Sequence, residues 1–336
     1  MKFPYRVMHI ASLHIILVVV MITAASAQTP PSDSASQLLA PSGQIAYIRA
    51  GNIWIMDADG TNQRMVCEVH NADGRLSWSP DNRQIVFTRS GVVDLKAPDM
   101  TGGRHKVYDL FLCDLDSADT GNMKHWIRLT EQLGARGPEW SGDGAKILLW
   151  NDMNADRISA HHPSYQLCLL NVADGEIELL RPDWKQEEEL FLVTPTMNDS
   201  GDIAFVFFDE YQPGGIVVLS TDEIKISLDS IGTLAAKNMG LVAPRWSPDG
   251  AWLAAIGVDS AEAGLYRLSP DLLEKSLIVK APARTTLAQY PPSFSPDAKW
   301  LTFATDDGSI WICDIEGNNL RRLTRPGKDT APCWSR

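Results

Sequence analysis

The chain has 336 residues, of which 44% are hydrophobic and 21% are charged, and its formal net charge is −12 at pH 7. So acidic a protein repels the phosphate backbones of nucleic acids, and the sequence contains no cluster of Lys and Arg that would offset this repulsion. Nucleic acid is therefore excluded as an expected partner.

The first 27 residues have the features of a secretory signal peptide. Lys2 and Arg6 give a positive start, Ile15–Ile22 is an apolar core too short to span a bilayer comfortably, and Ala25–Ala27 is a small-x-small cleavage site. We expect residues 1–27 to be removed, which would take the net charge from −12 to −14. The mature chain is then expected to work in the periplasm or outside the cell, without insertion into a membrane. A retained N-terminal anchor is the alternative.

Residues 28–40 are polar and rich in Pro and Ser, and we expect them to form a linker. From residue 41 on, a phrase of the form P-x-W-S-P-D-G, followed by an apolar run, recurs along the chain. Clear copies span Arg75–Phe87, Gly137–Leu149, Ala243–Ala255 and Pro291–Phe303, and a degenerate copy spans Thr194–Phe207. The Trp position of the successive copies is held by Trp78, Trp140, Met197, Trp246, Phe294 and, in a last short copy, Trp334.

A second phrase follows each copy of the first. It has apolar residues on both sides of a turn rich in Gly, Asp and Asn, as in Asn52–Val66, and is typical of a β-hairpin. The Ser-Pro-Asp-Gly sequence of the first phrase suits a type I turn, and no long segment has a helical period. Together the two phrases predict four short strands per repeat. The prediction for residues 41–336 is therefore an all-β, six-bladed β-propeller of four-stranded antiparallel blades.

The last copy, Ala331–Ser335, supplies only one strand. We expect it to be the innermost strand of a blade that Pro41–Gly60 completes, so that hydrogen bonds between the C-terminal strand and the N-terminal strands close the ring. On this interpretation the chain is a complete propeller with no catalytic domain after it.

Two segments in particular, Ile53–Asn62 (IWIMDADGTN) and Ile310–Thr324 (IWICDIEGNNLRRLT), together with the W-S-P-D-G copies, resemble the TolB-like, WD-repeat-like β-propellers. The resemblance covers nearly the whole mature chain and implies the same propeller fold. Two departures limit what it implies for function. The α/β domain that precedes the propeller of TolB is missing, so the partner-binding role of TolB in the cell envelope is not carried over. The G-x-S-x-G string of peptidases with related propellers does not occur either.

Strand order within a blade places the uniform Ser-Pro-Asp-Gly turns on one face and the variable connections on the other. Binding groups are expected on variable loops held by a rigid frame, which points to the channel mouth on the variable face. The candidate ligand-binding residues at this rim are His70, Arg75, Arg136, Tyr290 and Asp329. The two arginines could bind a carboxylate bidentately, or they could pair with acidic residues of neighbouring blades.

The connection Asn151–Tyr165 is the candidate metal site. Asp152, Asn154 and Asp156 occupy every second position, which is the spacing of oxygen ligands in calcium-binding loops. His161 and His162 could bind a transition metal or contact the bound glycan or peptide. Adjacent His side chains on an extended segment point to opposite sides, so a site would need a further ligand such as His70 or His105. The alternative is a solvated polar insertion.

The cysteines and tryptophans of the repeat are interpreted as core residues. Cys113, Cys168 and Cys313 occupy equivalent buried positions, which leaves Cys67 and Cys333 as the remaining pair that could form a disulfide. The repeat Trp residues are expected to pack between blades rather than to bind sugars.

The sequence thus favours an exported, monomeric, non-catalytic binding or scaffold propeller that engages a protein or a glycan or peptide ligand at its variable face. The alternative is a metal-assisted lyase or hydrolase of acidic carbohydrates with a site at the channel mouth. No cofactor is expected other than, on this alternative, a divalent metal such as calcium or a transition metal.

Overall fold

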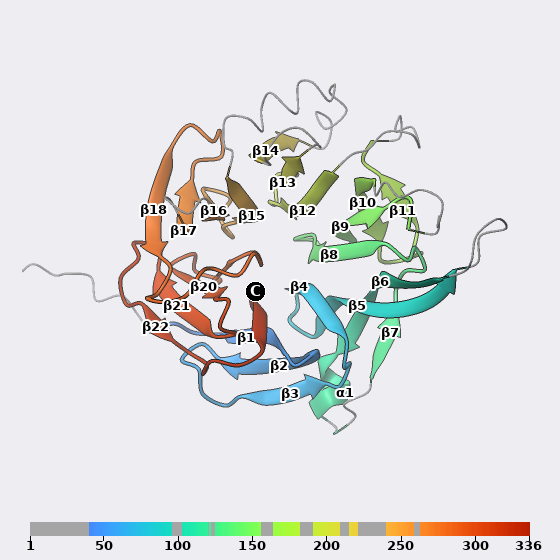
Figure 1. Cartoon of the computed structure of the whole chain (residues 1–336), viewed down its shortest axis with the longest axis horizontal. Coiled ribbons are helices and arrows are strands. Elements are labelled where there is room, and N and C mark those ends of the chain that lie inside the picture. The colour runs from blue at the N-terminus through green and yellow to red at the C-terminus, as the bar shows by residue number, and fades with distance from the viewer. Residues whose placement is uncertain are drawn as a thin grey trace, which may run out of the picture. The chain divides into compact units, whose positions relative to one another are not determined.

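Short apolar runs rich in β-branched and aromatic residues alternate with Gly, Asp and Asn turns after residue 40, and each run forms a strand. The structure is a computed structural model, and it describes residues 40–95, 103–119, 121, 125–155, 164–181, 191–208, 215–220, 240–258 and 263–336. Pro41–Arg336 form one unit. Its sheets are arranged around a centre, with β4, β8, β12, β15 and β23 close to it, so the fold is an all-β propeller (Figure 1).

Four of the sheets have four antiparallel strands. The first contains β23 (Asp329–Trp334), β1 (Gln44–Arg49), β2 (Asn52–Asp57) and β3 (Arg64–Cys67). The second contains β4 (Ala72–Trp78), β5 (Gln84–Leu95), β6 (Gly103–Asp114) and β7 (Trp126–Arg128), with the short helix α1 (Leu115–Asp119) after β6. Another contains β15 (Leu241–Trp246), β16 (Leu253–Gly257), β17 (Gly264–Leu268) and β18 (Lys275–Lys280). The last contains β19 (Ser293–Phe294), β20 (Trp300–Ala304), β21 (Ile310–Asp314) and β22 (Arg321–Arg322).

The remaining sheet has seven strands. Its strands are β8 (Ala135–Trp140), β9 (Lys146–Asp152), β10 (Tyr165–Asn171), β11 (Ile177–Leu179), β12 (Phe191–Met197), β13 (Asp202–Phe208) and β14 (Gly215–Ser220). The prediction of six four-stranded blades is therefore wrong: the described residues form four such blades and one larger sheet. The cause is a single parallel pair, Tyr165 with Phe191, which joins β10 to β12. Ring contacts between these two side chains, at 5.6 Å between centroids, support the join.

The Trp residues of the repeat are buried between neighbouring sheets, as expected. Trp78 is 2% exposed and packs against Ile53 and Ile55 of the first sheet. Trp140 packs against Leu112 of the second sheet, and Trp334 packs against residues of the last. Burial of these large aromatic surfaces stabilises the packing of one sheet on the next. All five cysteines are buried free thiols, so Cys67 and Cys333 do not form a disulfide in this structure.

The Ser-Pro-Asp turns are closed by the side chains that define them. The Ser79 hydroxyl donates a 2.6 Å hydrogen bond to the Asp81 carboxylate and accepts one from the backbone N–H of Gln84. The hydroxyl of Ser247 does the same for its own turn. These local bonds fix the first hairpin of these two copies, which gives a physical reason for the recurrence of Ser and Asp in the turn.

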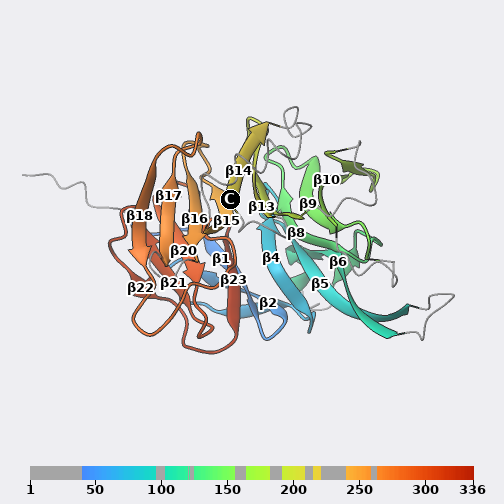
Figure 2. The same cartoon turned by 45° about the horizontal axis from the view of Figure 1, so that its top comes forward.

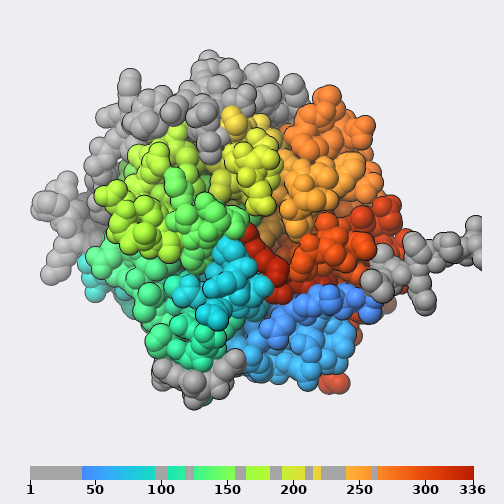
Figure 3. All heavy atoms as spheres, turned by 180° about the vertical axis from the view of Figure 1, so that it is seen from behind, coloured from blue at the N-terminus to red at the C-terminus, as the bar shows by residue number. Residues whose placement is uncertain are grey.

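The two ends of the described chain pair with each other, as predicted. β23 is antiparallel to β1, with Trp334 opposite Ile45 and Asp329 opposite Arg49. The Trp334 indole N–H donates to the carbonyl of Ser42 at 2.8 Å. Seen from behind, the red C-terminal segment lies at the centre between the cyan and the orange parts of the chain (Figure 3). Within the residues that the structure describes, no helix is long and apolar enough to cross a membrane.

Candidate functional site

The first strands of the sheets bring several of the predicted rim residues to one pocket. The pocket has a volume of ≈ 290 Å³ and includes Arg75 on β4, Arg136 on β8 and Tyr290, which precedes β19. We call it the rim pocket. Its lining residues are Asp73, Gly74, Arg75, Thr88, Tyr108, Arg136, Gly137, Trp150, Thr194, Gln289, Tyr290 and Pro291.

Arg136 is held in the rim pocket by aromatic rings rather than by an acid. Its guanidinium carbon lies 3.5 Å from the ring centroid of Tyr108 and 5.0 Å from that of Trp150. Within the described part of the chain, its buried Nε atom has no hydrogen-bond partner and its guanidinium has no carboxylate partner. Stacking leaves the in-plane N–H groups of a guanidinium available, so Arg136 presents a positive charge and unused donors.

Gly137 is required beside Arg136. Its φ is +62°, and a Cβ atom there would lie 2.6 Å from the indole nitrogen of Trp150. Any other residue would strain the backbone and displace the ring that supports the guanidinium.

The other wall of the rim pocket is polar and aromatic. Asp73 is 3.1 Å from the ammonium of Lys106, which lies over the ring of Tyr108. The long β5–β6 hairpin, which extends beyond the neighbouring strands, carries Lys106 and Tyr108 (Figure 2). Burial, followed by the nearby Asp73 carboxylate, raises the pKa of Tyr290, which therefore stays protonated and can donate a hydrogen bond.

Arg75 also lines the rim pocket but is engaged within the protein, and it lies three residues before Trp78, whereas Arg136 lies four residues before Trp140. Its side chain is 6% exposed, and it donates hydrogen bonds to the Glu139 carboxylate and to the carbonyl of Pro195. Arg245 lies 3.3 Å from the same carboxylate, and Arg336 donates to the carbonyl of Trp140 at 2.6 Å. Arg75 thus ties the first strands together through Glu139, and we assign it a structural role.

The charges in this cluster set the ionisation of Glu139. Burial alone would raise its pKa, but the guanidinium groups of Arg245, Arg75 and Arg336 outweigh burial and hold the pKa below its usual range. Burial lowers the pKa of Arg75 to about 10, which still leaves it charged at neutral pH.

The sequence alone did not single out Glu139, Arg245 and Arg336. The signal was present in the P-x-W phrase, where the middle residue is Glu139 in one copy and Arg245 in another.

The remaining candidates lie outside the rim pocket. Asp329 is 2% exposed and accepts two 2.7 Å hydrogen bonds from Arg49, so it joins β23 to β1. His70 is exposed and 3.4 Å from Glu68. The Asp152 carboxylate accepts bonds from the backbone of Asn154 and Ser164, as in a turn.

Asp156, His161 and His162 lie outside the described residues, so the structure neither brings them together nor separates them. Among the residues that are described, no three His, Cys, Asp or Glu side chains are placed to hold a metal ion.

Comparison with solved structures identifies the fold as that of the TolB-like propellers. TolB from Acinetobacter baumannii superposes with a TM-score of 0.62 at 16% identity, over 88% of this chain and 67% of that one. The TolB-like structure from Agrobacterium tumefaciens gives 0.57 at 13% identity, over 88% and 91% of the two chains. A chain of a nidogen–laminin complex gives 0.57 at 8% identity, over 87% and 98%. No protein-family profile and no curated protein sequence matches the chain. At these identities the likeness shows the fold alone.

Proposed function

We propose that the protein is an exported, non-catalytic binding propeller that takes a carboxylate-bearing group of a glycan or peptide ligand into the rim pocket. The observation that carries this proposal is Arg136, a guanidinium aimed at a pocket and stacked on Tyr108 without a carboxylate partner in the described residues. Charge-assisted bonds from a pre-oriented guanidinium to a carboxylate are strong and geometrically selective. Periplasmic or extracellular location and action as a monomer belong to the proposal.

The size of the rim pocket defines how much of the ligand it can hold. At ≈ 290 Å³ it is at the lower end of the range of about 300–1,000 Å³ for small-molecule sites. It can therefore enclose one sugar ring or one amino-acid side chain. Trp150, Tyr108 and Tyr290 offer ring faces for the apolar side of such a group, beside the donor groups of Arg136.

Calorimetric titration with small acids tests this proposal. The probes are D-glucuronic acid and N-acetylglycyl-phenylalanine, each compared with its uncharged counterpart, the glucuronic acid methyl ester or the phenylalaninamide. We expect at least one acid to bind more tightly than its counterpart. The acid that binds distinguishes a glycan ligand from a peptide ligand.

Substitution of Arg136 locates the binding. Arg136→Gln should weaken the preferred acid about tenfold or more, because a hydrogen bond to a charged group contributes about 1.5–3 kcal/mol. The matched control is Arg322→Gln, since Arg322 also lies over an aromatic ring, at 5.9 Å from Trp311, but on the outermost strand of its sheet. Equal affinities of wild type and Arg136→Gln, with both proteins folded, would refute the assignment. The assignment would also be refuted if neither acid binds at about 10 mM. Titration at this concentration detects even complexes whose binding free energy is less favourable than about −4.1 kcal/mol.

A further inference from the structure

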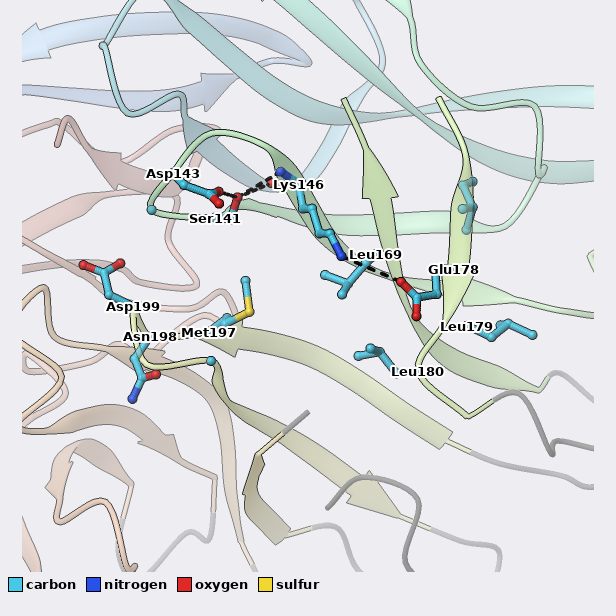
Figure 4. A pocket seen from close by; sticks show the side chains of 13 residues that line it. Ser141, Asp143, Lys146, Leu169, Glu178, Leu179, Leu180, Met197, Asn198 and Asp199 are labelled. Carbon is cyan, nitrogen blue, oxygen red and sulfur yellow. Dashed lines mark hydrogen bonds and ion pairs between the residues drawn. The ribbon is translucent and has the colours of Figure 1, made fainter. Parts of the chain in front are cut away.

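A groove lies in the seven-stranded sheet, at the strand ends opposite to those that form the rim pocket. Figure 4 shows the side chains that line it. Its volume is ≈ 930 Å³, and it lies between the β8–β11 part and the β12–β13 part of the sheet. We call it the inter-repeat groove. Its lining residues are Ser141, Gly142, Asp143, Lys146, Leu169, Ile177, Glu178, Leu179, Leu180, Met197, Asn198, Asp199 and Gly201.

The groove lies where one copy of the repeat lacks its tryptophan. Trp140 fills the corresponding place one repeat earlier, where it packs against the cross-strand pair Val86 and Leu112. The equivalent pair in the next repeat is Leu148 with Leu169, and the residue packed against it is Met197. A thioether side chain is narrower than an indole and adapts to irregular space, so Met197 is only partly buried and leaves the groove open.

The floor and the edges of the groove differ in polarity. Leu169, Leu180 and Met197 form an apolar floor (Figure 4), in which Leu169 and Leu180 are 7% and 6% exposed and Met197 is only partly buried. Such a floor is favourable for an apolar group large enough to displace water from it.

The edges of the groove carry an excess of negative charge. Among the described residues that line the groove, Asp143, Glu178 and Asp199 are acidic, and Lys146, 3.7 Å from Glu178, is the only basic one. A hydrogen bond from the Ser141 hydroxyl lowers the pKa of Asp143, so this carboxylate is ionised at neutral pH. An occupant should therefore be apolar at its centre and positively charged on its flanks.

We propose that the inter-repeat groove docks an aromatic side chain of a partner peptide, flanked by Lys or Arg, in the place that Trp78, Trp140, Trp246 and Trp334 fill in other copies of the repeat. The aromatic ring would rest on Leu169 and Met197, and the flanking cations would face Asp143, Glu178 and Asp199. This is a second binding surface, distinct from the rim pocket in position, charge and ligand.

Titration with three peptides tests the chemistry of the groove. Acetyl-Lys-Trp-Lys-amide should bind the wild-type protein, whereas acetyl-Lys-Ala-Lys-amide should bind at least about tenfold more weakly because it lacks the buried apolar area. Acetyl-Glu-Trp-Glu-amide should also bind more weakly, since its charges repel those of the groove edges. Absence of binding of the Lys-Trp-Lys peptide at about 10 mM, or equal binding of all three, would overturn the proposal.

Substitution of Met197 tests the location. Met197→Trp supplies the side chain of the other copies and should reduce binding of the Lys-Trp-Lys peptide more than tenfold, while the melting temperature stays equal or rises. The matched control, Met197→Leu, leaves the groove open and should bind as the wild type does. Unchanged binding by a folded Met197→Trp variant would place the peptide elsewhere and contradict the assignment.

If Met197→Trp does not fold, substitutions of exposed acids decide the question. Glu178, whose side chain is 69% exposed, and Asp199 can be replaced as Glu178→Gln and Asp199→Asn without loss of core packing. The double variant should bind the Lys-Trp-Lys peptide several-fold more weakly and with a smaller dependence on salt. An unchanged affinity and salt dependence would refute the proposal. The oligomeric state gives a last test. If the wild type and Met197→Leu are dimers and the double acid variant is a monomer, a second copy of the chain occupies the groove. That result would also contradict docking of a partner peptide.

Discussion

Deletion of Thr330–Arg336 is expected to destabilise the propeller strongly and to lower its melting temperature. The deletion removes most of β23 and with it the pairing to β1. It also removes Trp334, which is 2% exposed, and the carbonyl of Cys333 that accepts a 3.0 Å bond from the Trp78 indole. Truncation of one such buried Trp to Ala costs about 3–5 kcal/mol, and total stabilities of domains are about 5–15 kcal/mol. Loss of the strand therefore removes a large part of the stability of the protein.

Thermal and urea denaturation measure this effect. The control is deletion of Gln28–Ala40, which precedes β1, and the point substitution Trp334→Ala gives an intermediate case. We expect the wild type and the N-terminal deletion to have the highest melting temperatures, Trp334→Ala a lower one, and the C-terminal deletion the lowest. Equal melting temperatures for the two deletions would show that pairing of β23 with β1 contributes little to stability.

Replacement of Glu139 by Gln should destabilise the protein by about 3–5 kcal/mol, because it leaves buried guanidinium groups without their acid. Arg75 and Arg245 both lie against this carboxylate, and their side chains are 6% and 13% exposed. The matched control is Glu131→Gln, since Glu131 also faces an arginine, at 3.7 Å from Arg128, but its side chain is 85% exposed. An exposed pair of this kind contributes about 0–1 kcal/mol. Equal urea midpoints for the two variants would contradict the role given to Glu139.

The lowered pKa of Glu139 also predicts how stability depends on pH. A carboxyl whose pKa is lower in the folded state than in the unfolded state stabilises the fold at pH values above the unfolded value of 4.5. This contribution is lost as the pH falls from there through the lower folded pKa. Wild-type stability should therefore decline more steeply than that of Glu139→Gln in acid. Parallel pH profiles of the two proteins would show that Glu139 is not responsible.

Local rules predicted much of the fold. The Ser79–Asp81 turn follows from residues adjacent in sequence, and the burial of Trp78 and Trp334 follows from their place in the repeat. The number of separate blades could not be predicted in this way. It depends on whether strands of neighbouring repeats pair with each other, and the pairing of Tyr165 with Phe191 joins the first residues of β10 and β12, which lie far apart in the sequence.

The candidate site shows a similar division. Arg75 and Arg136 precede the repeat Trp by three and four residues, and the sequence indicates that both lie at the channel rim. Only the packing of the sheets determines that Glu139 reaches Arg75, while Arg136 rests on Tyr108. The P-x-W phrase shows that charged residues occupy its middle position in two copies, but which of them pair across strands of different repeats is a tertiary property.

A crystal structure of the protein with D-glucuronate or N-acetylglycyl-phenylalanine, whichever binds more tightly, tests the central claim most directly. The account predicts the carboxylate of the ligand in the rim pocket, with its oxygens about 2.7–2.9 Å from the guanidinium nitrogens of Arg136 and with Arg136 still stacked on Tyr108. A ligand bound at another place, or an Arg136 guanidinium paired with a carboxylate of the protein itself, would contradict the account.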